Sequence, residues 1–391
     1  MARRRRSIRD GQKGIGDFAA YAERLQIADL IHERGPTTVA AFMDLALYHP
    51  QLGYYARVAR RTGQTGDFFT SVDVGPLFGD LIADQVAEMA RFVASTPFDL
   101  VEVGAGDGRL AADVLSALRH RHPDVYGRTR LYLVEASPVA RAAQPGSLAG
   151  MTDHLVASSE SMPDTFTGVL LANELLDAMP VHQVVMRADG LREIYVVSDG
   201  RMLATREGPP SSAALGACLT RQGVHLEPGW RAEINLRAQE WMREVGRRLA
   251  MGFIIVIDYG HDAQELYSAS HASGTLTSYA RHVASDPSSN LPGWLDRPGY
   301  RDITSHVDFT SVRAAAEEEG MVTLGWLDQT YFLLGLAARE LPAVTRDLKE
   351  RLALKTLLMP GGLGSTHKVL LLGKNVGTPA LSGCSYRMRI T

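Results

Sequence analysis

A glycine-rich turn with acidic neighbours, Gly104 to Gly108, is the segment whose residue types best suit a small charged ligand. It follows an apolar strand pattern and precedes a helical pattern, so its glycines allow a tight turn and a close backbone approach to a ligand. Glu102 lies just before the turn and Asp107 lies inside it. These carboxylates would repel a pyrophosphate and suit a ligand that carries an ammonium and a sulfonium. The turn therefore indicates a pocket for S-adenosyl-L-methionine, with Glu102, Gly104, Gly106 and Asp107 as cofactor-binding residues, rather than an ordinary surface turn.

Other cofactor contacts are expected where neighbouring strands end. Glu135 closes an apolar strand at the position where doubly wound folds hold a ribose through its two hydroxyls. Ser158 follows the third strand, where an adenine ring would lie, although a serine in a plain loop is an equally supported interpretation. Asn173 follows the fourth strand and is the last of these candidates, with helix capping as its alternative role.

Three carboxylates at the same expected sheet edge are the candidates for catalysis. Glu174 and Asp177 follow the fourth strand, and Asp258 ends a later central strand. A guanidinium acceptor needs paired carboxylates for bidentate contacts, which favours Glu174 and Asp177 with Asp258 in reserve. A hydroxyl or carboxyl acceptor would instead need a base to remove its proton, and the candidates for this base are His182, His306 and Asp308.

The elements that position these residues predict an α/β fold. Strand patterns alternate with helical ones from residue 96 to residue 374, which indicates a doubly wound, mostly parallel sheet of the class I, Rossmann-like type. Residues 1–95 are expected to form an N-terminal helical cap region, and 375–391 a tail. Insertions at about 181–230, with an Asp189-Gly190 hairpin turn, and at 262–310 would form a smaller subdomain.

The composition limits which cellular compartment and which binding partners we expect. A formal net charge of -3 gives no general drive toward nucleic acid, and no apolar run is long enough to cross a membrane. Cys218 and Cys384 lack metal-site spacing and suit a reducing cytosol, so the sequence predicts a cytoplasmic protein without a metal. The basic cluster Arg3 to Arg6 resembles neither a secretory signal nor a transit peptide, because no apolar region follows it and acidic residues do. The oligomeric state is open, and a dimer is compatible with the sequence.

From about His49 to Leu372 the chain resembles the MidA-like methyltransferase family, which includes the mitochondrial complex I assembly methyltransferase. The resemblance consists of short blocks in one order: His49-Pro50, Gly53-Tyr54-Tyr55, Gly66-Asp67-Phe68, Thr70-Ser71, Phe78-Gly79, Val101 to Gly108, Leu133-Val134-Glu135 with Ser137-Pro138, Ala172-Asn173-Glu174, Asp177-Ala178, Pro180, Asp258-Tyr259-Gly260, Asp302-Ile303-Thr304 and His306-Val307-Asp308-Phe309. It implies a class I fold with S-adenosyl-L-methionine as cofactor and S-adenosyl-L-homocysteine as product. It also adds Thr70 and Ser71 to the expected cofactor-binding residues.

The family resemblance implies methylation of a protein arginine, as in the mitochondrial member. Some positions depart from the family pattern. Val72-Asp73-Val74 occupies the place where family members typically have Pro-Glu-Ile. Ala105 and Asp107 replace a Pro and an Arg of the usual loop, and Leu175-Leu176 replace two Phe. We therefore expect a methyltransferase acting on a protein arginine side chain. Two alternatives stay open, a small-molecule O- or N-methyltransferase of a biosynthetic pathway and a non-catalytic respiratory-complex assembly factor.

Overall fold

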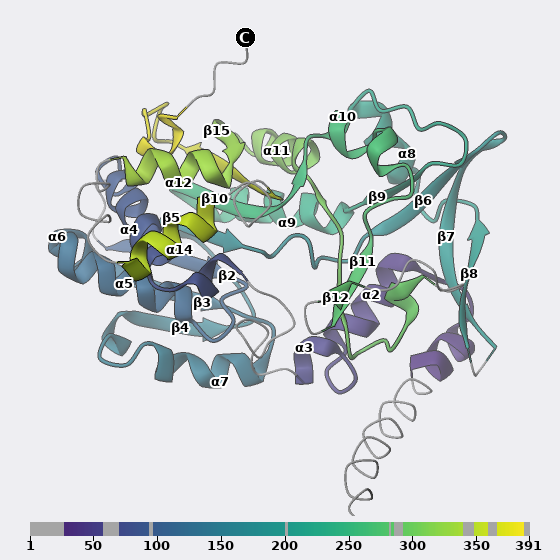
Figure 1. The fold of residues 1–391 in the computed structure, drawn as a ribbon, viewed down its shortest axis with the longest axis horizontal. Coiled ribbons are helices and arrows are strands. Elements are labelled where there is room, and N and C mark those ends of the chain that lie inside the picture. Colours follow the sequence, from purple (N-terminus) through teal and green to yellow (C-terminus); the bar gives the residue numbers. More distant parts are fainter. Residues whose placement is uncertain are drawn as a thin grey trace, which may run out of the picture.

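An eight-stranded sheet forms the centre of the molecule (Figure 1). The computed structural model describes residues 27–57, 70–93, 97–199, 202–280, 283–284, 292–338, 348–358 and 366–386. The Arg3 to Arg6 cluster and the Gly66-Asp67-Phe68 block lie outside the described residues. The strands of the sheet are β2 (Phe98–Val103), β3 (Thr129–Val134), β4 (Leu155–Ser159), β5 (Phe166–Asn173), β10 (Leu249–His261), β14 (Val307–Asp308), β15 (Val322–Asp328) and β16 (His367–Lys374).

The order of these strands creates one point where ligands bind in doubly wound folds. The sheet runs β15-β16-β10-β5-β2-β3-β4, and β14 pairs with the end of β10. Strands β4, β3, β2, β5 and β10 are parallel, whereas β16 is antiparallel to β10 and β15 is antiparallel to β16. The chain moves outward from β2 in one direction and from β5 in the other. The crevice beyond the carboxyl ends of β2 and β5 is therefore the expected ligand site, and the predicted fold class is confirmed.

Alternating apolar residues explain how helices cover both faces of the sheet. In β10, Phe253, Ile255 and Ile257 join one buried cluster, and Ile254 and Val256 join the other. This period of two is what a central strand needs when both of its faces are covered. The first cluster includes residues of α4 (Leu77–Met89), α5 (Arg109–Arg121), α12 (Gln329–Ala337) and α14 (Leu348–Leu358), and the second includes residues of α9 (Leu236–Arg248) and α11 (Phe309–Glu318).

Further helices lie in the connections and flanking segments of the chain. The α-helices among them are α6 (Pro123–Tyr126), α7 (Pro138–Ser147) and α10 (Ala263–Leu266), and the 3-10 helices are η1 (Ser71–Val74), η2 (Thr152–His154), η3 (Ala269–His271), η4 (Gly293–Leu295) and η5 (Ser382–Cys384). In the described part of the chain, no helix combines the length and the apolar character needed to cross a bilayer.

A second sheet lies beside the first, on the right in Figure 1. The predicted Asp189-Gly190 hairpin joins its strands β6 and β7 and is confirmed. The elements of this region are β1 (Thr37–Thr38), β6 (His182–Arg187), β7 (Gly190–Ser198), β8 (Leu203–Gly208), β9 (Arg231–Ile234), α2 (Val39–Tyr48), α3 (Tyr54–Arg57) and α8 (Ala213–Arg221), with a small three-stranded sheet of β11 (Thr277–Ala280), β12 (Val283–Ala284) and β13 (Asp302–Thr304).

The described N-terminal residues pack in two different places, whereas the sequence predicted that residues 1–95 form one cap region. Helix α2 buries Phe42 and Met43 against the second sheet, whereas α4 buries Phe78 and Leu81 in the core of the central sheet. We therefore propose that the cap ends after α3 and that α4 belongs to the methyltransferase core. Leu381 is also buried in this core, so we propose that residues 375–386 belong to it rather than to a separate tail.

Candidate active site

The glycine turn is held in place by the neighbouring strand. Gly104, Gly106 and Gly108 have φ angles of +73°, +54° and +80°, a region that side chains other than glycine rarely adopt. The backbone N–H of Gly106 donates to Oε2 of Glu135 over 2.9 Å, and Oε1 of the same carboxylate accepts from the N–H of Ser137 over 2.8 Å. The end of β3 therefore fixes the shape of the turn that follows β2.

Glu102 presents a buried acid to the ligand side of this turn. Its side chain lines the cleft but is only 5% exposed, and burial raises the pKa of the carboxyl to about 8, with the charges of Asp107 and Glu135 adding to the rise. Its Oε2 has no hydrogen-bond partner among the described residues. A buried acceptor without a partner is costly, so this atom fits a ligand that brings a hydroxyl or ammonium donor.

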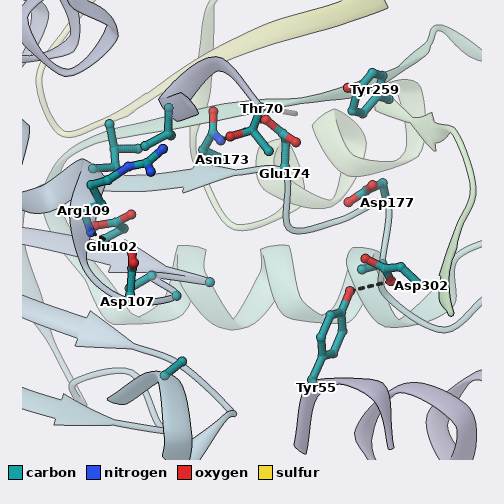
Figure 2. A pocket seen from close by; sticks show the side chains of 17 residues that line it. Tyr55, Thr70, Glu102, Asp107, Arg109, Asn173, Glu174, Asp177, Tyr259 and Asp302 are labelled. Atoms are coloured by element: carbon teal, nitrogen blue, oxygen red, sulfur yellow. Dashed lines mark hydrogen bonds between the residues drawn. The ribbon is translucent and has the colours of Figure 1, made fainter. Parts of the chain in front are cut away.

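A cleft opens above the glycine turn, and we call it the central cleft (Figure 2). Glu102, Asp107 and Arg109 lie at one end of it, and Asp177, Asp302 and Tyr55 lie at the other. It is the crevice at which the order of the strands reverses. Its walls come from the turn and from Asn173, Glu174, Asp177 and Ala178 after β5, together with Tyr55, Thr70, Val72, Leu110, Ala140, Tyr259 and Asp302.

Asp258 holds the segment after β5 rather than lining the cleft. Its carboxylate is fully buried, and Oδ2 accepts the backbone N–H groups of Leu175 and Leu176 over 3.0 and 2.7 Å. Its Oδ1 accepts from the N–H of Tyr259 over 2.8 Å. We predicted Asp258 as a catalytic reserve, but this geometry makes it a positioning residue for the turn that carries Glu174.

Glu174 is presented by a strained backbone. Its φ of +51° lies in the left-handed region, which costs a non-glycine residue free energy and occurs mostly at functional sites. Its N–H donates to the carbonyl of Ile257 over 2.8 Å, and Oε1 lies 3.5 Å from Nε2 of the buried His367. The neighbouring Asn173 lines the same cleft and donates to Glu174 Oε1 over 3.3 Å. The strain is therefore maintained by β10, and it directs Glu174 into the cleft.

Two more carboxylates, those of Asp177 and Asp302, line the cleft with Glu174. Asp177 is buried, and burial, followed by the charges of Asp258, Asp302 and Glu174, raises its pKa well above the usual range. Asp302 accepts a hydrogen bond of 2.8 Å from the hydroxyl of Tyr55, drawn in Figure 2. Tyr55 and Asp302 were not among the residues predicted for the site, although both stand in motifs of the family resemblance. The carboxylate of Asp302 makes the cleft more acidic than the sequence indicated.

The remaining predicted cofactor residues divide into one that lines the cleft and two that support it. Thr70 lines the cleft, and its N–H and hydroxyl both donate to Asp73. Ser71 is fully buried and shares hydrogen bonds with Gln329. Ser158 donates to Gln144 over 2.6 Å, and Gln144 in turn donates to the carbonyl of Gly106. Ser71 and Ser158 therefore support the residues around the site, and neither lines the central cleft.

None of the three alternative bases lines the central cleft. His182 contacts Glu193 in the second sheet over 2.7 Å. Asp308 caps α11 by accepting from the N–H of Ser311. His306 lies with two other histidines beyond the end of β10. Among the described residues, the three alternative bases therefore lie away from the cleft, and carboxylates line it.

Fold and cleft together define the class: a doubly wound α/β domain with an acidic ligand cleft at the point where the strand order reverses. The model of a family of S-adenosyl-L-methionine-dependent methyltransferases matches residues 81–327, and the chain belongs to this family. It is thus an enzyme that uses S-adenosyl-L-methionine, as predicted, and the MidA-like resemblance is confirmed.

Curated relatives and a solved structure support this assignment. The protein arginine methyltransferase NDUFAF7 homolog of Drosophila melanogaster is 29% identical over 343 residues, covering 79% of this chain and 73% of the relative. The Homo sapiens protein arginine methyltransferase NDUFAF7 is 28% identical over 366 residues, covering 85% and 77%. A likely methyl transferase from Burkholderia thailandensis, solved with S-adenosyl-homocysteine, has a TM-score of 0.83 and 28% identity, covering 94% of this chain and 96% of that one.

The predicted cytoplasmic location was wrong, because the curated relatives are mitochondrial proteins. The prediction rested on Cys218 and Cys384, which are free in the structure. Free cysteines argue against an oxidising compartment, but they do not distinguish one reducing compartment from another.

The buried acid Glu102 makes stability depend on pH. Its folded-state pKa of about 8 lies above the ordinary value of 4.5, so the folded protein keeps a proton that the unfolded chain loses. This contribution is fully present below pH 4.5 and is lost as the pH rises to about 8, at a slope approaching about 1.4 kcal/mol per pH unit. Urea unfolding of the ligand-free protein from pH 5 to about pH 9 should show this loss, and Glu102→Gln should remove it. An unchanged slope in the variant would contradict the assignment.

Proposed function

We propose that the enzyme transfers the methyl group to the guanidinium of an arginine side chain in a protein. The observation that carries this proposal is the acidic end of the central cleft, where Glu174, Asp177 and Asp302 lie together. Burial raises the pKa of Asp177, and repulsion by Asp258, Asp302 and Glu174 adds to the rise. A guanidinium stays protonated at any ordinary pH and binds carboxylates in a bidentate manner, so it would relieve the repulsion.

The chain's own residues provide binding, orientation and proton transfer. Bound S-adenosyl-L-methionine supplies a methyl group activated by a sulfonium. Glu174 and Asp177 would hold the guanidinium with one nitrogen in line with the carbon–sulfur bond. As the nitrogen–carbon bond forms and the carbon–sulfur bond breaks, the electron pair leaves with sulfur, and one of these carboxylates accepts the proton that the nitrogen loses.

Tyr55 and Asp302 would form the outer wall of the acceptor site. The hydrogen bond between them joins the cap helix α3 to β13, so the cap and the inserted segment both contribute to this wall. This arrangement supports an acceptor that enters from the side of the cap as part of a longer chain. The names of the curated relatives, which are protein arginine methyltransferases, point to the same acceptor.

The test uses cofactor labelled on the methyl group, the purified enzyme and lysate from cells that lack it. Label is expected in a protein band, and acid hydrolysis of that band should release labelled methylarginine. Label in methyllysine or in a protein carboxyl ester would contradict the arginine proposal. Label found only in small molecules would instead favour the biosynthetic alternative, and tight cofactor binding without any transfer would favour the assembly-factor alternative.

A further inference from the structure

We propose that His261, His271 and His306 form a binding site for a divalent transition metal, with Zn²⁺ as the expected ion. One ring nitrogen of each histidine lies within 4.8 Å of those of the other two. The ring centroids are 4.9, 5.2 and 5.8 Å apart. Three imidazoles on one zinc ion hold their nitrogens about 3.3 Å apart, because each Zn–N bond is about 2.0–2.1 Å. Small ring rotations would therefore bring these nitrogens to a common ion.

The neighbour of one ring already favours the tautomer that binds metal. Nδ1 of His261 lies 3.0 Å from the carboxylate of Glu265 but is buried and has no hydrogen-bond partner among the described residues. Nδ1 of His271 lies 3.1 Å from the backbone carbonyl of Glu265, which can only accept, so this carbonyl favours a proton on Nδ1 and leaves the lone pair on Nε2. Metal-binding histidines almost always have such a second partner on the nitrogen that does not bind the ion.

His306 supplies an independent indication. Its Nδ1 is buried and has no hydrogen-bond partner in the part of the chain that the structure describes. A buried imidazole nitrogen without a partner costs free energy and is available to bind a metal ion.

The histidines come from three segments that a metal ion would fasten together. His261 ends β10, His271 belongs to η3, and His306 lies between β13 and β14. They are half-buried, so an ion can reach them from solvent. The sequence predicted no metal because the histidines are 10 and 35 positions apart (271 − 261 and 306 − 271), without a motif. Three histidines leave one position of a tetrahedral ion for water or for Glu265.

The site lies behind the acceptor end of the central cleft and would serve to position it. Tyr259 lines the cleft two residues before His261, and Asp302 lines it four residues before His306. Gly260 and Val307 are paired between β10 and β14. A bound ion would therefore lock the segment that carries Asp302 against the strand that carries Tyr259.

The experiment titrates Zn²⁺ into full-length protein that carries no polyhistidine tag and has been treated with chelator. Calorimetry is expected to show one ion per chain, with a Kd of about 1 μM or tighter. The His271→Ala variant should weaken binding at least about tenfold to a hundredfold, and His306→Ala should do the same. His225→Ala, which removes an exposed histidine elsewhere, is the matched control and should bind as the wild type does.

A measurement on the wild-type protein keeps the test decisive even if a variant fails to fold. Co²⁺ bound by three imidazoles should give the visible absorption of a tetrahedral ion, and Zn²⁺ should displace it. X-ray absorption of the zinc-loaded protein should show three imidazole ligands. The proposal is overturned if the wild type binds no zinc, if a folded His271→Ala variant binds as tightly as the His225→Ala control, or if the bound ion has fewer than three imidazoles.

Discussion

Replacing Glu174 with glutamine is expected to lower kcat by about 10²- to 10³-fold while leaving cofactor affinity within about threefold of wild type. Glutamine keeps the size of the side chain and removes its charge. The carboxylate lies in the central cleft on a strained backbone. The strain costs free energy, which the rest of the fold offsets, and this keeps Glu174 in the cleft. Without it, the guanidinium loses a partner that orients one nitrogen and accepts its proton. Single-turnover methylation with saturating labelled cofactor measures the loss.

The control for this variant is Glu227→Gln, which makes the same change at an exposed position and should keep full activity. Calorimetry with S-adenosyl-L-homocysteine separates binding from chemistry in both variants. A Glu174→Gln enzyme that methylates at the wild-type rate would remove this residue from the mechanism. The proposed cofactor site would not be affected by that outcome, and Asp177 and Asp302 would become the candidates for holding the acceptor.

Replacing Glu135 with alanine is expected to weaken cofactor binding by about tenfold to a hundredfold. The carboxylate holds the N–H of Gly106 and ends β3 at the position where a ribose is bound in this fold. Its loss therefore relaxes the glycine turn on which the cofactor site is built. Glu135→Gln keeps one uncharged acceptor and should fall between alanine and wild type. Calorimetry with S-adenosyl-L-methionine and with its product gives both affinities.

Thermal unfolding without ligand accompanies the Glu135 measurements, so that a loss of affinity is not confused with a loss of fold. Glu227→Ala is the matched control and should bind the cofactor normally. Equal affinity of the Glu135→Ala variant and this control would show that the carboxylate neither shapes the turn nor contacts the cofactor. A ranking in which glutamine binds worse than alanine would contradict the proposed acceptor role.

The strands of the core and the glycine turn could be predicted from the sequence because their signals are local. Apolar runs such as Phe253 to Ile257 and the glycines after β2 need no distant partner to be recognised. The order of the strands, by contrast, depends on tertiary contacts. The acceptor end of the cleft also depends on them, because Tyr55 and Asp302 are 247 positions apart and meet only after the cap packs on the segment that contains β13.

The role of Asp258 shows why a correct position does not establish a role. The sequence placed this carboxylate at the correct sheet edge, near Glu174 and Asp177. Backbone N–H groups from Leu175 and Leu176 occupy Oδ2, and the N–H of Tyr259 occupies Oδ1. Which carboxylates face the ligand and which face the backbone is decided by the local turn, and the residue pattern alone does not contain that turn.

Strand β10 passes from the sheet core to the three histidines without interruption. Asp258, Tyr259 and His261 follow one another on it, and they face the turn after β5, the central cleft and the histidine rings respectively. Nuclear magnetic resonance signals from the imidazole of His261 should therefore respond when an arginine-containing peptide binds near Tyr259, although the ring does not line the cleft. The histidine cluster thus offers an internal reporter of acceptor binding that requires neither an added label nor turnover.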